Sequence, residues 1–323
     1  MARARPLPEP LTNRPFSVAE ARNHGLSPSR LRASDLEKPT RGVRTTRTPA
    51  VATPDDETHT QRLNRIRDDL LARARRFAPA LTPDQFFSHE TGLALLGAPL
   101  PFTTASERAV HVSARRPAAQ PRRAGTVGHR LQARESSLRL ADRLPVEHPA
   151  RLWRQAATLW AHDDLVAAGD FLVHPRNRLL TVDDLRREVA EAGDVSGGRL
   201  ARAIEDIRPG AETAEETALR LAIIRAGLPE PLLNWSLCTD NGRFVARLDL
   251  SYPRYRVGVE HDGRTHAFDE AQFRRDSDRW DEIRAQGWEL VRILSHHLRP
   301  DSAVAVRRVA DALVSAGWRP GQP

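Results

Sequence analysis

Two stretches decide how the last third of this chain folds: Arg243-Phe-Val-Ala-Arg-Leu-Asp-Leu250 and Tyr255-Arg-Val-Gly-Val-Glu260. Both are rich in the branched and aromatic residues that favour β-strands. A third β-like run, Trp235 to Thr239, precedes them. It is separated from Arg243 by Asp240-Asn-Gly242, which is typical of a tight hairpin turn. The pattern therefore predicts three successive strands.

Helices are expected before and after these three strands in the sequence. Residues 213–226 carry a helical pattern that stops at Gly227, and residues 269–286 form a longer amphipathic pattern that stops at Gly287. A mostly apolar run, residues 288–294, then predicts a fourth strand. Residues 211–320 are thus expected to form one α/β domain with the element order αβββαβ.

Two acids lie near strand ends within this order, Asp249 in the second strand and Glu260 in the third. An aspartate between Leu248 and Leu250 is costly to bury unless something pairs with it, and Arg247 is one available partner. Two carboxylates on adjacent strands form a hard oxygen site suited to Mg²⁺ or Mn²⁺. Such an ion can activate water for attack on a phosphodiester. We therefore take Asp249 and Glu260 as candidate metal ligands and catalytic residues.

Three further residues are candidate catalytic groups, and each has a structural alternative. Asp262 can bind the ion or hold the attacking water, or belong with Gly263 to a turn. His266 can be a ligand, a proton carrier or a phosphate contact, or an ordinary surface histidine. Glu216 follows Thr213 by three residues, so it can serve the metal or only cap the helix.

Five blocks in this region carry a resemblance to a known family. They are Glu216-Thr-x-Leu-Arg, Arg247-Leu-Asp-Leu-x-Tyr-Pro253, Val259-Glu-x-Asp-Gly-x-x-His266, Gln272-Phe-x-Arg-Asp276 and Gly287-Trp-x-x-x-Arg292. In this order and spacing they resemble the endonuclease-like domains of unknown function allied to very-short-patch-repair endonucleases, within the PD-(D/E)XK superfamily. The resemblance implies a restriction-endonuclease-like fold, with Glu216, Asp249, Glu260, Asp262 and His266 at the site.

One residue departs from the superfamily pattern. The lysine of the usual E-x-K motif would stand at position 262, which is Asp262 here, and the single lysine of the chain is Lys38. Arginine cannot replace lysine in proton transfer, because a guanidinium stays charged. The similar endonuclease-like domains also carry Asp-Gly at this point. Either His266 or a second metal then takes over, or the fold binds DNA without cutting it.

The N-terminal two-thirds predicts two modules after a disordered leader at residues 1–13. Residues 14–48 read as helix, glycine turn, short helix and strand, the outline of a winged helix-turn-helix, and Pro15 to Arg44 resembles the winged-helix domain of abortive-infection type IV antitoxins. A packing or dimerisation module would give the same outline. Residues 58–210 are expected to form an α+β middle region.

Positive charge is concentrated in these modules. Residues 1–45 hold nine Lys and Arg against four acids, and residues 101–140 hold eight Arg against two, whereas residues 211–323 hold 16 Arg against 17 acids. This distribution suits phosphate contacts outside the acidic domain, although an arginine-rich proteome or solvated charge on a β-hairpin explains it equally simply. The candidate nucleic-acid contacts are Arg30, Arg32, Arg115, Arg116, Arg122, Arg123 and Arg275.

Composition also excludes some classes of protein. A single cysteine, Cys238, excludes a disulfide framework and a cysteine-based zinc site, and no run approaches 18 apolar residues. We expect a cytoplasmic protein with no membrane partner. The sequence favours a DNA-binding protein with a Mg²⁺-dependent (or Mn²⁺-dependent) endonuclease-like domain, and a toxin or a second copy of the chain is a possible further partner. The alternative is a non-catalytic antitoxin or transcriptional regulator with a degenerate nuclease fold.

Overall fold

A computed structural model describes residues 5–47, 57–101, 108–133, 138–139, 144–262 and 270–322. The chain divides into two compact units, Met1–Thr158 and Leu159–Pro323. Helices and mixed or antiparallel sheets occur in both, so the expected mixed α/β class is confirmed. The division falls inside the predicted middle region, between Thr158 and Leu159. None of the described helices is both long and apolar enough to cross a membrane.

The first unit begins with a small three-stranded antiparallel sheet in the order β1 (Phe16–Ser17), β3 (Val43–Thr46), β2 (Leu36–Glu37). Ser17 caps helix α1 (Val18–Asn23) by accepting a hydrogen bond from the N–H of Glu20, as its sequence predicts. The short helix expected after the glycine turn is a 3-10 helix of three residues, η2 (Arg30–Arg32). The core of this module is formed by Leu11, Phe16, Ala21, Leu26, Leu31 and Leu36.

The described part of the predicted leader is not disordered. A 3-10 helix, η1 (Glu9–Leu11), places Leu11 in the core with no exposed surface. Partly buried Leu7 packs against the same core. Burial of Leu7 and Leu11 stabilises the ordered conformation of this segment in spite of its prolines and arginines.

In the described rest of the first unit there is a five-stranded sheet in the order β6-β5-β4-β8-β7, together with helices α2, α3 and α4. Strands β5 and β6 pair in parallel, so the β-hairpin considered for the arginine-rich segment between them is wrong. Strands β4 and β8 are also parallel, whereas β4–β5 and β7–β8 are antiparallel. The elements are α2 (His59–Phe77), η3 (Ala78–Ala80), β4 (Gln85–Phe87), α3 (His89–Leu95), β5 (Val110–Arg115), β6 (Thr126–Leu131), β7 (Leu138–Arg139), β8 (Pro145–Val146) and α4 (Pro149–Ala156).

The second unit opens with the helices α5 (His162–Val173), α6 (Val182–Ala192), α7 (Arg199–Asp206) and α8 (Ala214–Arg225). Asp170 of α5 accepts hydrogen bonds from Thr217 and Arg220 of α8, and all three side chains are buried. This buried polar contact joins the helices to the domain that follows. It explains why the compact unit begins near residue 159 and not near residue 211.

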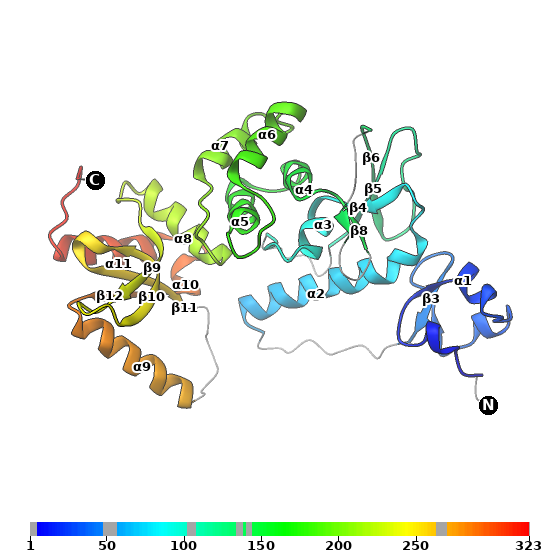
Figure 1. Ribbon diagram of the computed structural model, residues 1–323, viewed down its shortest axis with the longest axis horizontal. Helices are drawn as coiled ribbons and strands as arrows, with labels where there is room; N and C mark the ends of the chain where they lie inside the picture. Colours follow the sequence, from blue (N-terminus) through cyan, green and yellow to red (C-terminus); the bar gives the residue numbers. More distant parts are fainter. Residues whose placement is uncertain are drawn as a thin grey trace. The chain divides into compact units, whose positions relative to one another are not determined.

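A four-stranded sheet follows, in the order β12-β11-β10-β9, with β11 and β12 parallel and the other pairs antiparallel (Figure 1). Its strands are β9 (Leu232–Cys238), β10 (Phe244–Tyr252), β11 (Val257–Asp262) and β12 (Glu289–Leu294). Helix α9 (Glu270–Ala285) lies between β11 and β12 in the chain. Helices α10 (Ser295–Leu298) and α11 (Ala303–Ser315) follow β12. The predicted turn at 240–242 joins β9 to β10, with Gly242 at a φ of 83° that favours glycine.

Two hydrophobic clusters hold this sheet between helices. One contains Leu219 and Ile223 of α8 and Val309 of α11, together with Leu250 and Val259 of the sheet. The other contains Ile283 of α9 with Leu248 and Trp288. The acidic residues of interest therefore lie on strands with packed helices around them, where burial affects their protonation.

Candidate functional site

Asp249 and Glu260 lie next to each other on the paired strands β10 and β11. Leu250 pairs with Val259, so Asp249 and Glu260 are the next residues along each strand. The side chain of Asp249 accepts a hydrogen bond from the main-chain N–H of His261, with an Oδ2–N distance of 3.0 Å. The backbone of β11 therefore fixes the orientation of the Asp249 carboxylate.

Burial raises the pKa of Asp249 above its usual value, while the His261 N–H and the charge of Arg279 act in the opposite direction. The sequence offered Arg247 as a partner for this carboxylate. That alternative is wrong for the described residues, because the Arg247 guanidinium donates to Glu212 at 2.7 Å. The carboxylate of Asp249 instead accepts its hydrogen bond from the backbone of β11.

Glu216 is buried at the start of α8, with 4 % of its surface exposed. Its carboxylate accepts hydrogen bonds from the N–H of Glu212 (2.9 Å) and the hydroxyl of Thr213 (3.0 Å), and Thr213 caps the helix. Burial, together with the nearby negative charge of Asp249, raises the pKa of Glu216 to about 7. The residue therefore serves the helix terminus and also lies within electrostatic reach of Asp249.

Glu260 and Asp262 are both held by arginines. The guanidinium of Arg279, on α9, donates to Glu260 and also to the main-chain carbonyl of Arg247 at 3.2 Å. Arg292, on β12, donates to Asp262, and its guanidinium lies 3.9 Å from the ring centre of Trp280. Because Arg279 also lowers the pKa of Asp249, its charge lies close to both predicted metal ligands.

His261 is a site residue that the sequence interpretation missed. Its Nε2 is buried and has no hydrogen-bond partner among the described residues. Burial lowers the pKa of His261, and the negative charges of Glu215, Asp249 and Asp262 oppose this shift only in part. The signal available was its position in the sequence, directly between Glu260 and Asp262.

Two predicted residues cannot be placed. His266 lies outside the described residues, and so does the side chain of Arg275, although its backbone belongs to α9. The structure therefore says nothing of their contacts. Around the acidic centre it describes Glu216, Asp249, Glu260 and Asp262, together with the newly identified His261 and Arg279.

The other arginine candidates differ in their availability. Arg30 is paired with Asp35 through two hydrogen bonds, and Arg115 with buried Glu147 at 2.7 Å. Arg123 donates to the main-chain carbonyl of Arg41 at 3.0 Å. The three remaining candidates have exposed surfaces: Arg32, Arg116 and Arg122.

A cavity of about 960 Å³ in the first unit brings two of these arginines together with other basic groups. Its lining comes from two segments far apart in the sequence, residues 38–42 and 122–124. Four of the lining side chains are basic: Lys38, Arg41, Arg122 and Arg123. A concave basic surface of this kind suits a phosphate-rich ligand.

Comparison with known proteins adds sequence relatives but no activity. No family model matches the chain, and no solved structure matches it significantly. It is 27% identical over 185 residues to uncharacterised proteins of two Mycobacterium tuberculosis strains. The match covers 57% of this chain and 65% of the length of each relative, so it spans less than two-thirds of those proteins.

Proposed function

We propose that the chain binds DNA and that its C-terminal domain hydrolyses or nicks phosphodiester bonds with Mg²⁺ or Mn²⁺. The observation that carries this proposal is the placement of Asp249 and Glu260 as neighbours on β10 and β11. The five motif blocks that resemble very-short-patch-repair-type endonuclease domains support the same interpretation. A cytoplasmic location and a toxin or self-association partner remain predictions.

The donor atoms fit a hard divalent ion. Asp249 and Glu260 would hold it through carboxylate oxygens, the ligands that Mg²⁺ and Mn²⁺ prefer. Glu216 lies within electrostatic reach of Asp249 and brings a third carboxylate to the same region. A bound ion would supply an activated water and offset negative charge on the phosphate.

The surrounding residues divide the remaining tasks. Arg279 and Arg292 offset the charge of the acids, and either can turn to a DNA phosphate because a guanidinium binds carboxylates and phosphates alike. Neither can carry a proton, since guanidinium stays charged. His261 can carry one, because its buried Nε2 has no hydrogen-bond partner within the described chain, and Glu216, whose pKa is raised to about 7, is a second candidate.

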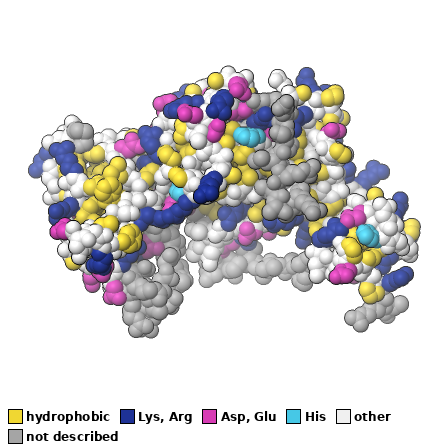
Figure 2. Space-filling view, in the orientation of Figure 1, with side chains coloured by type: hydrophobic (Ala, Val, Ile, Leu, Met, Phe, Trp, Pro, Cys, Tyr) yellow, Lys and Arg dark blue, Asp and Glu magenta, His cyan; other side chains and the backbone are white. Residues whose placement is uncertain are grey.

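DNA affinity would come chiefly from the first unit. Lys and Arg side chains are spread over the face of the molecule in Figure 2, with acidic side chains among them. In the basic cavity, Lys38, Arg41 and Arg122 provide a local concentration of positive charge. Phosphate contacts of this kind give affinity without base specificity.

The test is nicking of supercoiled plasmid by the full chain in Mg²⁺, in Mn²⁺ and in EDTA. We expect metal-dependent nicking by the wild type and its loss in Asp249→Asn, which removes one charge at nearly constant volume. Asp240→Asn, in the exposed turn between β9 and β10, is the matched control and should nick normally. Equal nicking by wild type and Asp249→Asn would disprove an active centre at Asp249.

The alternative function is a non-catalytic regulator, and two observations favour it. Glu260 and Asp262 are paired with arginines, and position 262 lacks the usual lysine. A regulator should bind DNA equally well in EDTA and in Mg²⁺ and should nick under no condition. The plasmid assay, together with a DNA-binding measurement in both buffers, separates the two functions.

A further inference from the structure

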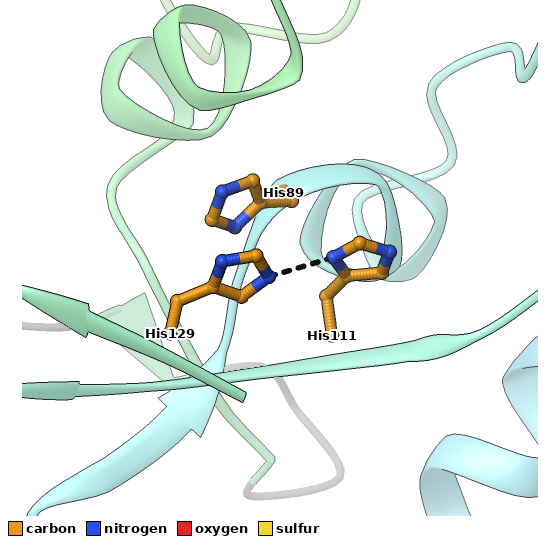
Figure 3. A group of neighbouring side chains, drawn as sticks. All are labelled: His89, His111 and His129. Atoms are coloured by element: carbon orange, nitrogen blue, oxygen red, sulfur yellow. Dashed lines mark hydrogen bonds between the residues drawn. The ribbon is translucent and has the colours of Figure 1, made fainter. Parts of the chain in front are cut away.

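Three histidines converge in the first unit, apart from the acidic centre. His89 begins α3, His111 lies on β5 and His129 lies on β6 (Figure 3). His129 pairs with Ser113, so His111, two residues before Ser113 on β5, shares its face of the sheet. One ring nitrogen from each histidine lies within 4.8 Å of one from each of the others.

The rings are close enough for a shared ligand. Nδ1 of His111 and Nε2 of His129 are 2.9 Å apart, and the His89 ring stacks on the His129 ring with centres 3.7 Å apart. His89 and His111 are each 5 % exposed, whereas His129 is half-buried. The nitrogens are therefore largely shielded from water, while His129 leaves a route by which an ion can enter.

Neighbouring groups orient the imidazoles as they do in metal sites. Nε2 of His111 lies 3.8 Å from the carboxylate of Glu90, which in turn pairs with Arg108. Nδ1 of His89 contacts the hydroxyl of Ser88 at 3.0 Å. Metal-bound histidines commonly direct their second nitrogen to a carboxylate or another polar group, which sets the tautomer and the ring orientation.

The backbone also holds His89 in an unusual conformation. Its φ is 50°, in the left-handed region that favours glycine, and its N–H donates to buried Gln155 at 3.1 Å. The N–H of His111 donates to the hydroxyl of Thr91 at 2.9 Å. A positive φ like that of His89 persists where the surrounding structure imposes it, and it is often found at ligand sites.

The three imidazoles are in the form that binds metals. Burial lowers the pKa of His89 to about 2 and the pKa values of His111 and His129 to about 4. Each ring is therefore neutral at neutral pH and keeps a lone pair on one nitrogen.

We propose that His89, His111 and His129 bind one Zn²⁺-type transition-metal ion in the first unit. Imidazole nitrogens select Zn²⁺ and its neighbours in the transition series, whereas Mg²⁺ prefers oxygen ligands. The bound ion joins the start of α3 to β5 and β6, three segments that are far apart in the sequence. Three protein ligands leave a fourth position of the tetrahedron to water or to a small ligand.

The zinc content of the full chain tests this site. Each protein is stripped with chelator, reloaded with Zn²⁺, freed of excess ion and analysed by elemental mass spectrometry. We expect wild type and His24→Ala, a matched variant of an exposed histidine in the same unit, to retain one equivalent more than His129→Ala. Asp249→Asn should keep this ion, so the result does not depend on the nuclease proposal.

A second measurement needs no variant in the cluster, because X-ray absorption of the zinc-loaded wild-type chain should show imidazole scattering from three histidines. For the zinc-content measurement, circular dichroism should show that His129→Ala is folded. Equal zinc content in wild type and His129→Ala would overturn the proposal. So would a zinc spectrum dominated by carboxylate oxygen or by the sulfur of Cys238.

Discussion

The carboxylate of Asp249 accepts a hydrogen bond from the backbone N–H of His261, which links the two strands that carry the acidic centre. Burial lowers the pKa of the His261 imidazole, and the negative charge of Asp249 partly opposes this shift. Asp249 is therefore both a candidate ligand and a positioning group for the segment that carries Glu260. Replacement of Asp249 should lower metal affinity more than it lowers the stability of the fold.

We expect Asp249→Ala to lower Mg²⁺-dependent nicking by at least about 100-fold, because loss of even an outer-shell group commonly costs about 10–100-fold in affinity or activity. Calorimetric titration with Mn²⁺ should show weaker binding by the variant, and its thermal unfolding should stay cooperative. An unchanged nicking rate would contradict the assignment of Asp249 as a ligand.

If His261 carries a proton, His261→Gln should lower the nicking rate by about 100-fold, the lower range of general acid–base catalysis, while Mn²⁺ affinity stays near that of wild type. The pH dependence of the rate should also flatten. His296→Gln replaces an exposed histidine at the start of α10 and serves as the control. A variant that loses Mn²⁺ binding as well would make His261 a ligand and not a proton carrier.

Glu216 predicts a pH dependence of stability in the absence of metal. The pKa of Glu216 rises from 4.5 to about 7 on folding, so the folded protein holds more protons than the unfolded chain between these values. The free energy of unfolding contributed by this group should thus fall as pH increases from about 4.5 to 7, by on the order of 3 kcal/mol. Denaturant unfolding in EDTA should show a smaller decline for Glu216→Gln, whereas Glu215→Gln should keep the decline.

Two ion pairs between α5 and α8 allow a matched comparison. Asp170 and Arg220 are 1% and 0% exposed, whereas Asp163 and Arg225 are 46% and 51% exposed. Asp170→Ala leaves a buried guanidinium charge without this carboxylate and should cost about 3–5 kcal/mol of stability. Arg225→Ala, in the exposed pair, should cost less than about 1 kcal/mol. Urea unfolding measures both, and equal losses would contradict the role of burial.

The basic cavity predicts a salt-dependent phenotype. Arg122→Ala should weaken binding to DNA of any sequence and reduce the slope of log affinity against log salt by about 1, if the guanidinium contacts one phosphate. Arg186→Ala, an exposed arginine on α6, is the control. Fluorescence anisotropy at several salt concentrations gives both slopes, and identical slopes would exclude Arg122 from the contact surface.

Near-neighbour signals in the sequence account for the local elements of the second unit. Asp240-Asn-Gly242 predicts the turn between β9 and β10, and Gly227 and Gly287 follow α8 and α9 closely. These features depend on the conformational preferences of a few adjacent residues, so they are readable without the fold. The adjacency of Asp249 and Glu260 was also predictable from the order of the strands in the chain, because consecutive strands usually pair.

Only the tertiary structure decided which side chains meet across longer distances. Helix packing brings Arg279 to Glu260 and Asp170 to Arg220, and sheet pairing gathers His89, His111 and His129 from three separate segments. The parallel pairing of β5 and β6 and the boundary after Thr158 were equally invisible in the pattern. Such contacts depend on burial summed over whole helices and sheets, and no local run of residues encodes that sum.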